Sequence, residues 1–495
     1  MSLTHAVKRT LRHTLLCSVM TGAIFLAANP GFAQTASQMD RLEQQIRDLQ
    51  QQLQGMRAEV TTTQQQVQKS QDDMKKVQTD VAGAPKVTFA NGRPGWVSAD
   101  GRNSVQLTGR LHMDFGDYLS VKRSGSNQSL QDGVNARRAR LGVLGKVAGD
   151  WGYGLILDFG GTTDSTPSSS IIENAYISYN GFRPVGIDFG YIDVPWTLDE
   201  ATSSNDIMFL ERATPGVVAT AFGTGDNRAA LGIHSNDDRY WAGFYLTGPT
   251  SGASHSGSNM SQLAEAARFT YQVYQGSDMS LHLGLDGTYL SNPRNGAAHQ
   301  VTLSDRPELR VDPTQFLTTG TVNANSGTVG GIEAAAAYRN VFAQGEYYHY
   351  SIDQFATSAT APSPTLGFDG AYIQASYSIG GKRKYNPGSG AYSGVIPDHP
   401  MDSSFSNWGA LEFAARYSYT DLNDNVASGS SQASTGGVFG GKQQGYTLGI
   451  NWYPNTNVRF MLDYIHEDVD KLASDGVTPN NAHLDAIAAR AQFAF

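Results

Sequence analysis

The chain is poor in charge, in cysteine and in long apolar runs. Only 16% of its 495 residues are charged, which excludes a highly charged disordered protein. No run of about 18 uncharged apolar residues follows the extreme N-terminus, which excludes a helical membrane protein. The 36 basic residues are outnumbered by 45 acidic ones, so we expect no nucleic-acid partner. The only cysteine is Cys17, which leaves the rest of the chain without disulfides, thiol catalysis or thiolate metal sites.

The polarity of the chain comes from neutral residues and is accompanied by many aromatic ones. There are 54 glycines, 23 tyrosines and 21 phenylalanines. A polar chain rich in glycine and tyrosine, without long apolar runs, fits two classes of protein. One is a soluble all-β protein, and the other is a transmembrane β-barrel, whose strands alternate between apolar and polar residues.

Residues 1–33 are typical of a secretory signal peptide. A positive segment with Lys8, Arg9 and Arg12 precedes an apolar stretch at 15–28, and small residues place cleavage after Ala33. Removing these three positive charges changes the formal net charge from −9 to −12. A charge of this sign concerns solubility and long-range steering, not the fold.

Residues 34–82 carry the apolar 3,4 spacing of a coiled coil. Six consecutive heptads have a narrow seam, formed by Met39, Leu42, Ile46, Leu49, Leu53, Met56, Val60, Thr63, Val67, Ser70, Met74, Val77 and Val81. A helix lying on the protein's own surface is the alternative, but it would need a wider apolar face. We predict a periplasmic coiled coil roughly 65 Å long, followed by a linker at 83–95 that is rich in glycine and proline.

From residue 96 onward the apolar period changes to two, which predicts an all-β, 16-stranded antiparallel transmembrane β-barrel over 96–495. Sixteen stretches of about ten residues alternate in this way, from 103–115 to 484–495. Short connections such as 148–150 separate longer ones, which we expect on the outside of the cell: 116–134, 194–227, 290–330 and 380–407. The final strand ends on Phe495, which resembles the signal that the outer-membrane assembly machinery recognises.

Several segments along the barrel resemble the phosphate-selective porin O and P family. They include Gly109-Arg110-Leu111, Ala136-Arg137-Arg138-Ala139-Arg140-Leu141, Phe209-Leu210-Glu211-Arg212 and Leu448-Gly449-Ile450-Asn451-Trp452-Tyr453. The resemblance covers about 96–495. It implies a homotrimer of sixteen-stranded barrels that passes anions through a basic constriction.

The resemblance also implies roles for particular arginines. Arg110, Arg137 and Arg138 match positions at the narrowest zone, and Arg212 matches a basic residue on the inward-folding loop 194–227, here called the third loop. Leu198, Ile207, Met208, Phe209 and Leu210 are candidates to anchor that loop to the inner wall. Secondary lumen charges are Arg140, Arg306 and Arg310.

Strand parity agrees with this assignment only in part. In the alternation of their strands, Arg110 and Arg138 stand at polar positions, which face the lumen. Arg137 stands at an apolar position, which faces the lipid. In the alternative interpretation the arginines only pair with carboxylates of a polar lumen, namely Asp114, Asp158, Glu173 and Glu211.

We therefore predict a Gram-negative outer-membrane porin, in contact with outer-membrane lipid, for passive diffusion of small hydrophilic solutes, with anions such as phosphate the preferred class. The alternative is a structural anchor whose coiled coil contacts peptidoglycan. We predict no catalytic residue, cofactor or metal. His466-Glu467-Asp468 is too sparse for a zinc protease motif, and Val426 replaces the glycine that a calcium loop starting at Asp421 would need.

Overall fold

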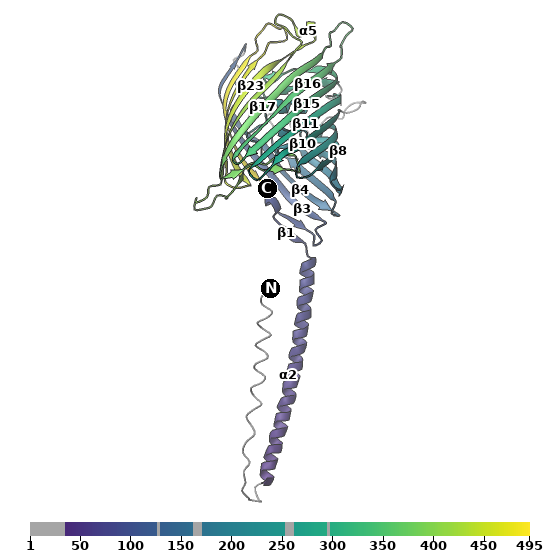
Figure 1. Cartoon of the computed structure of the whole chain (residues 1–495), viewed down its shortest axis with the longest axis vertical. Helices are drawn as coiled ribbons and strands as arrows, with labels where there is room; N and C mark the ends of the chain where they lie inside the picture. Colours follow the sequence, from purple (N-terminus) through teal and green to yellow (C-terminus); the bar gives the residue numbers. More distant parts are fainter. Residues whose placement is uncertain (1–34, 126–128, 162–170, 253–261, 295–297) are drawn as a thin grey trace. The chain divides into compact units, whose positions relative to one another are not determined.

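The computed structural model describes residues 35–125, 129–161, 171–252, 262–294 and 298–495 (Figure 1). The chain divides into two compact units, 1–82 and 83–495. The predicted signal peptide, residues 1–33, lies outside the described residues.

The first unit contains one long helix, α2 (Thr35–Gly83). Its apolar seam is uncovered along its whole length: Leu53, the least exposed of its large apolar residues, is still 49% exposed, and Val81 is 66% exposed. No helix in the described part of the chain is both long and apolar enough to cross a membrane.

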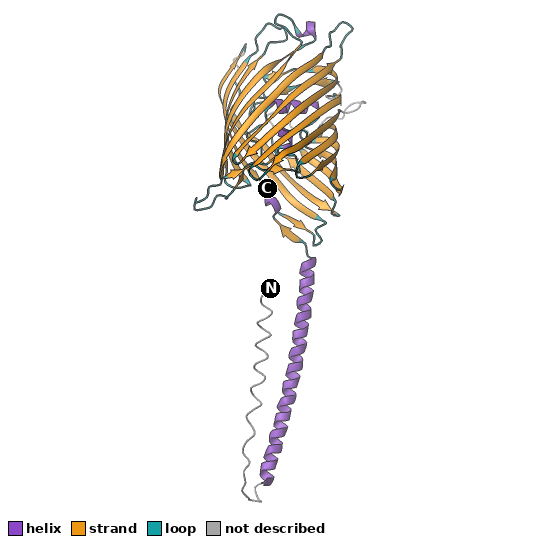
Figure 2. Cartoon of the chain, viewed as in Figure 1, coloured by secondary structure: helices purple, strands orange, loops and turns teal. Residues whose placement is uncertain are grey.

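The second unit is a closed antiparallel barrel of sixteen long strands, which confirms the predicted fold class (Figures 1 and 2). Each long strand pairs with its neighbour in the chain, and the last long strand pairs with the first, so the sixteen long strands form a closed ring. The strands are β3 (Ser104–Arg123), β4 (Gly133–Val147), β5 (Trp151–Asp158), β6 (Ile172–Phe182), β7 (Val185–Ile192), β8 (Arg228–Asn236), β9 (Tyr240–Thr250), β10 (Leu263–Gln275), β11 (Met279–Asn292), β15 (Val322–Tyr338), β16 (Val341–Gln354), β17 (Thr365–Ile379), β22 (Ala410–Asp424), β23 (Val438–Tyr453), β24 (Val458–Asp470) and β25 (Ala482–Ala494).

The alternating sequence pattern separates a lipid face from a lumen face. On β23, Leu448 and Ile450 are exposed outward, while Thr447 and Asn451 on either side of them are buried inside. Aromatic pairs such as Trp452 and Phe460, whose ring centroids lie 5.4 Å apart, gather near the short turns. Aromatic residues at both ends of the apolar band are typical of outer-membrane barrels.

The chain end closes the barrel by backbone pairing. The backbone N–H groups of Phe495 and Gly109 each donate to the other residue's carbonyl, both at 3.0 Å. Gly109 has no side chain because a Cβ atom there would lie 2.4 Å from the Phe495 ring. Before the first long strand, β1 (Lys86–Thr88) and β2 (Gly95–Val97) form a hairpin that extends the sheet beside β3. Part of the segment 83–95 is therefore strand.

One predicted loop position is wrong. Successive antiparallel strands reverse direction, so the connection between β17 and β22 lies at the end with the short turns, not with the long external loops. The prediction placed 380–407 outside because of its length alone. The number of strands that precede a connection, not its length, decides at which end of the barrel the connection lies. This segment contains four two-residue strands: β18 (Gly381–Lys382), β19 (Tyr385–Asn386), β20 (Ala391–Tyr392) and β21 (Ile396–Pro397).

The external loops contain short elements as well. These are β12 (Gln300–Val301), β13 (Ser304–Asp305), β14 (Leu317–Thr318) and α5 (Gln432–Thr435).

Candidate functional site

The third loop, residues 193–227, folds back into the barrel. It contains α3 (Leu198–Ala201), α4 (Thr214–Ala219) and the short helix η2 (Thr220–Phe222), visible inside the strands in Figure 2. Thr197 caps α3 by accepting from the backbone N–H of Glu200 at 3.1 Å. The lumen-facing carboxylate of Glu346 accepts from the N–H groups of Leu198 and Asp199 at 2.8 and 3.0 Å, which attaches α3 to the wall.

Apolar and polar contacts hold the rest of this loop. All five predicted anchor residues are buried, and Leu198, Met208 and Phe209 pack with residues of the wall. Arg416 donates to the carbonyl of Glu211 at 2.9 Å, and Arg459 donates to the carbonyl of Ile207 at 2.7 Å. Each loop carbonyl thus finds a donor on a different strand, which fixes the loop across the lumen.

Two further segments enter the lumen. From the long-loop end, the fifth loop (residues 293–321) sends in Glu308, which accepts from Arg416, and from Ser418 and Thr447 at 3.0 and 2.8 Å. From the short-turn end, Arg383 forms a buried two-point ion pair with Glu412, at 2.7 and 3.0 Å, and donates to the Asp206 carbonyl of the third loop at 2.6 Å. The lumen is therefore narrowed from both ends.

Arginines gather in a cavity of about 230 Å³ between the third loop and the wall. Five arginines and three carboxylates line it: Arg137, Arg138, Arg212, Arg228, Arg310, Glu200, Glu211 and Asp226. The structure thus brings together three of the four predicted constriction residues and one predicted secondary charge. Arg228, at the start of β8, was missed because it stands alone at a loop-to-strand boundary, without a sequence motif.

Arg137 enters this cavity because of a β-bulge. His112 of β3 pairs with Arg138, and Met113 pairs with Ala136, so Arg137 is an extra residue without a partner in β3. A bulge of this kind redirects a side chain, which explains its unfavourable parity in the sequence. Arg137 donates to both oxygens of Glu211, at 2.7 and 3.2 Å.

Arg138 is buried but retains free donors. Its side chain is 2% exposed, and within the described residues its Nε and Nη1 atoms have no hydrogen-bond partner. Unpaired guanidinium donors in a polar cavity are suited to an oxyanion, which accepts from forked N–H groups.

The other cavity arginines mainly hold the structure. Arg212 donates to the carbonyls of Asp199 and Thr202 at 3.0 and 3.1 Å, and so fastens the turn after α3. Arg310 pairs with Asp305 at 2.6 Å, and its Nε atom lies 3.6 Å from a Glu211 oxygen. Arg228 donates to the Thr224 carbonyl at 2.9 Å. Arg306, a predicted lumen charge, is buried on the fifth loop and does not line the cavity.

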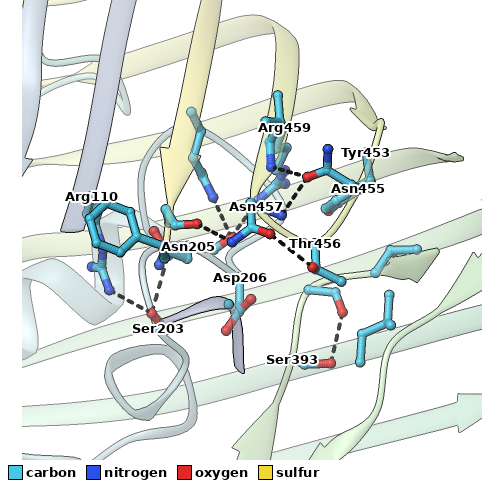
Figure 3. A pocket seen from close by; sticks show the side chains of 18 of the residues that line it. Arg110, Ser203, Asn205, Asp206, Ser393, Tyr453, Asn455, Thr456, Asn457 and Arg459 are labelled. Atoms are coloured by element: carbon cyan, nitrogen blue, oxygen red, sulfur yellow. Dashed lines mark hydrogen bonds between the residues drawn. The ribbon is translucent and has the colours of Figure 1, made fainter. Parts of the chain in front are cut away.

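Arg110 lines a different pocket, of about 510 Å³ (Figure 3). It donates to the Ser203 hydroxyl at 3.2 Å and also contacts Ser204, whereas Arg459 and Tyr453 lie on the opposite side. Its cross-strand partner Arg140 pairs with Asp158 at 2.7 Å and Glu173 at 2.5 Å. Pairing with lumen carboxylates, the alternative for these arginines, thus describes Arg140 and Arg137. Asp114 instead pairs with Arg490 of β25, a residue that no motif in the sequence marks.

Glu200 gives the cavity a titratable group. It lies on α3 of the third loop, outside the spanning strands, 3.4 Å from the Nε atom of Arg212. Burial raises the pKa of Glu200 to about 7, although the positive charge of Arg212 opposes this shift. Its carboxyl group therefore changes charge near neutral pH.

Three known outer-membrane proteins are similar to this chain. Porin O of Pseudomonas aeruginosa is 24% identical over 413 residues, which cover 81% of this chain and 90% of that protein. The anion-selective porin from Comamonas acidovorans is 14% identical, with a TM-score of 0.46, and the match covers 79% of this chain and all (100%) of that one. The trimer form of OmpT from Vibrio cholerae is 13% identical with a TM-score of 0.46, covering 79% and 99%.

The family assignment rests on the barrel itself. Residues 105–495 match the family described as phosphate-selective porin O and P, and they span all sixteen long strands except the first residue of β3. The chain belongs to the phosphate-selective porin O and P family and forms an outer-membrane porin channel.

Proposed function

We propose that this porin passes small anions in preference to cations and that the cavity beneath the third loop selects them. The observation that carries the proposal is Arg138, a buried guanidinium group in a cavity of five arginines, two of whose donor atoms have no partner among the residues that the structure describes. A permeating oxyanion such as phosphate loses water in a narrow lumen and regains donors from guanidinium groups.

The balance of charge supports this preference. Five arginines face three carboxylates in the cavity, which leaves two positive charges in excess when all groups are ionised. Glu211 is shared between Arg137, Arg310 and, from outside the cavity lining, Arg490, whose Nη2 lies 3.2 Å away. This carboxylate is therefore fully engaged, and Arg138 keeps its charge available to a solute.

The second part of the proposal concerns assembly. The uncovered seam of α2 favours a coiled coil between identical chains, since a narrow apolar stripe is buried best by equivalent helices. The barrel's short-turn end carries the N-terminal hairpin β1–β2, and short turns of such barrels face the periplasm. We place the coiled coil in the periplasm and the protein in a homotrimer.

The experiment is a planar-bilayer measurement of chloride current with added phosphate. Phosphate that occupies the arginine cavity should reduce the chloride current of the unsubstituted protein, and Arg138→Gln should weaken this inhibition. Arg339→Gln is the matched control, because Arg339 lies at a short turn with its side chain 66% exposed. Equal inhibition in all three folded proteins would remove Arg138 from the proposal.

A further inference from the structure

Two strands present the same short pattern to the outside of the barrel. β24 carries His466 and Asp468, and β25 carries His483 and Asp485, with one residue between the members of each pair. In the antiparallel register His466 lies opposite Asp485, and Asp468 lies opposite His483. Because side chains two residues apart share a face, the four groups form a two-by-two block.

The four side chains form a closed ring of contacts. Asp485 lies 2.9 Å from His466 Nδ1 and 3.2 Å from His483 Nε2. Asp468 lies 3.2 Å from His466 Nε2 and 2.7 Å from His483 Nδ1. Each imidazole therefore has one nitrogen toward Asp485 and the other toward Asp468, and the two rings are T-shaped with centroids 5.0 Å apart.

Three of these residues have the spacing of metal ligands. One ligand atom from each of His466, His483 and Asp485 lies within 4.8 Å of the others. Ligands about 2.1 Å from a tetrahedral zinc ion stand roughly 3.4 Å from one another. The contacts of 2.9 and 3.2 Å around Asp485 need only small adjustments to reach this geometry.

The neighbouring groups match the usual surroundings of such a site. A histidine that binds a metal commonly donates its other N–H to a carboxylate, and Asp468 is placed to accept from both rings. The Tyr464 hydroxyl donates to Asp485 at 2.7 Å and would orient that ligand. The side chains of His466 and His483 are 29% and 32% exposed, which leaves room for water at the fourth position.

We propose that His466, His483 and Asp485 bind a divalent transition-metal ion of the zinc class, oriented by Asp468 and Tyr464. Two imidazole nitrogens favour such an ion over calcium or magnesium, which take oxygen ligands. The sequence alone did not indicate this site, because His466-Glu467-Asp468 contains only one histidine and strand pairing supplies the second. The proposal is independent of channel selectivity.

The chain supplies its own control. On the outer face of β16 and β17, His349 contacts Asp369 at 2.9 Å, and Tyr347 donates to the same carboxylate. This group repeats the tyrosine, histidine and aspartate of the proposed site, but the described part of the chain places no second histidine in it. It should not hold the ion by itself.

The test is a calorimetric titration with ZnCl₂ of the full-length, untagged protein folded in detergent. We expect one zinc per chain for the unsubstituted protein and for His349→Ala, and loss of this binding in His466→Ala/His483→Ala. Asp468→Asn should weaken binding by about 10- to 100-fold, as loss of such an orienting group does elsewhere. Heat-modifiable gel mobility checks folding, and single-histidine variants replace the double variant if it does not fold. Absence of zinc binding by the unsubstituted protein, or equal binding by a folded histidine variant, would overturn the proposal.

Discussion

Arg137 and Arg138 are adjacent in sequence but differ in what their charges can do. Arg137 is committed to Glu211, whereas two donor atoms of Arg138 have no partner within the described residues. In a lumen of intermediate dielectric constant, the Coulomb interaction between a unit charge and a permeating ion about 6 Å away is worth roughly 1 to 3 kcal/mol.

We therefore expect Arg138→Gln to lower the anion-to-cation permeability ratio about fivefold, by the lower end of that Coulomb range. The measurement is the zero-current potential of the folded variant in a KCl gradient, compared with Arg339→Gln. If both variants keep the ratio of the unsubstituted protein, Arg138 is a structural residue.

The pKa of Glu200 predicts a pH effect with a definite sign. With its pKa raised to about 7, Glu200 is ionised at higher pH and neutral at lower pH. Lowering the pH from above to below this value removes one negative charge from the cavity. The interaction of a permeating anion with the cavity should then become more favourable by roughly 1 kcal/mol, and the preference for anions should increase. The Glu200→Gln variant should show the stronger anion preference at every pH, because its side chain is always neutral. A pH step of the same size in Glu200→Gln would assign the effect to another group.

For single residues, the sequence predicted which face of a strand a side chain occupies better than which groups that side chain contacts. Parity predicted the inward orientation of Arg138 because β4 pairs with β3 in an unbroken register from Arg138 to Lys146. Parity failed for Arg137, because a bulge depends on pairing with the neighbouring strand. The separation of Arg110 from the cavity arises from serine hydroxyls of a loop nearly a hundred residues away, which no local pattern specifies.

Among the elements, three segments that enter the lumen distinguish this barrel from an open tube. The third and fifth loops enter from one end, and residues 380–409 enter from the other. The sixteen strands were predictable, because lipid outside and water inside impose alternation on each of them. The inward folding of 380–409 was not, because it depends on the pairing of Arg383 with Glu412 on a later strand.

Removing this pair should loosen the segment from the short-turn end. Glu412 would keep Asn451 and Tyr453 as donors but lose its buried counter-charge, at a cost of roughly 3–5 kcal/mol. We expect Arg383→Ala to raise single-channel conductance and current noise. Lys382→Ala, an exposed substitution on the same segment, is the control. Unchanged conductance in folded Arg383→Ala would show that the segment does not narrow the pore.

For the whole molecule, the proposed coiled coil of a homotrimer predicts a contribution to assembly. Each seam residue buried between helices contributes roughly 1–2 kcal/mol, so deleting residues 35–82 should leave a folded barrel in a less heat-resistant trimer. The measurement is the temperature at which the trimer dissociates on gels, with and without these residues. An equal temperature for both proteins would favour the other role considered for α2, contact with peptidoglycan.

The central claim is that a porin with a net acidic sequence selects anions through one arginine-lined cavity. The most direct measurement is the zero-current potential of the unsubstituted full-length protein in a KCl gradient across a planar bilayer. We predict a potential with the sign of the chloride equilibrium potential, since the cavity carries an excess of positive charge. A potential of the opposite sign would show that the carboxylates of the lumen, not its arginines, control permeation.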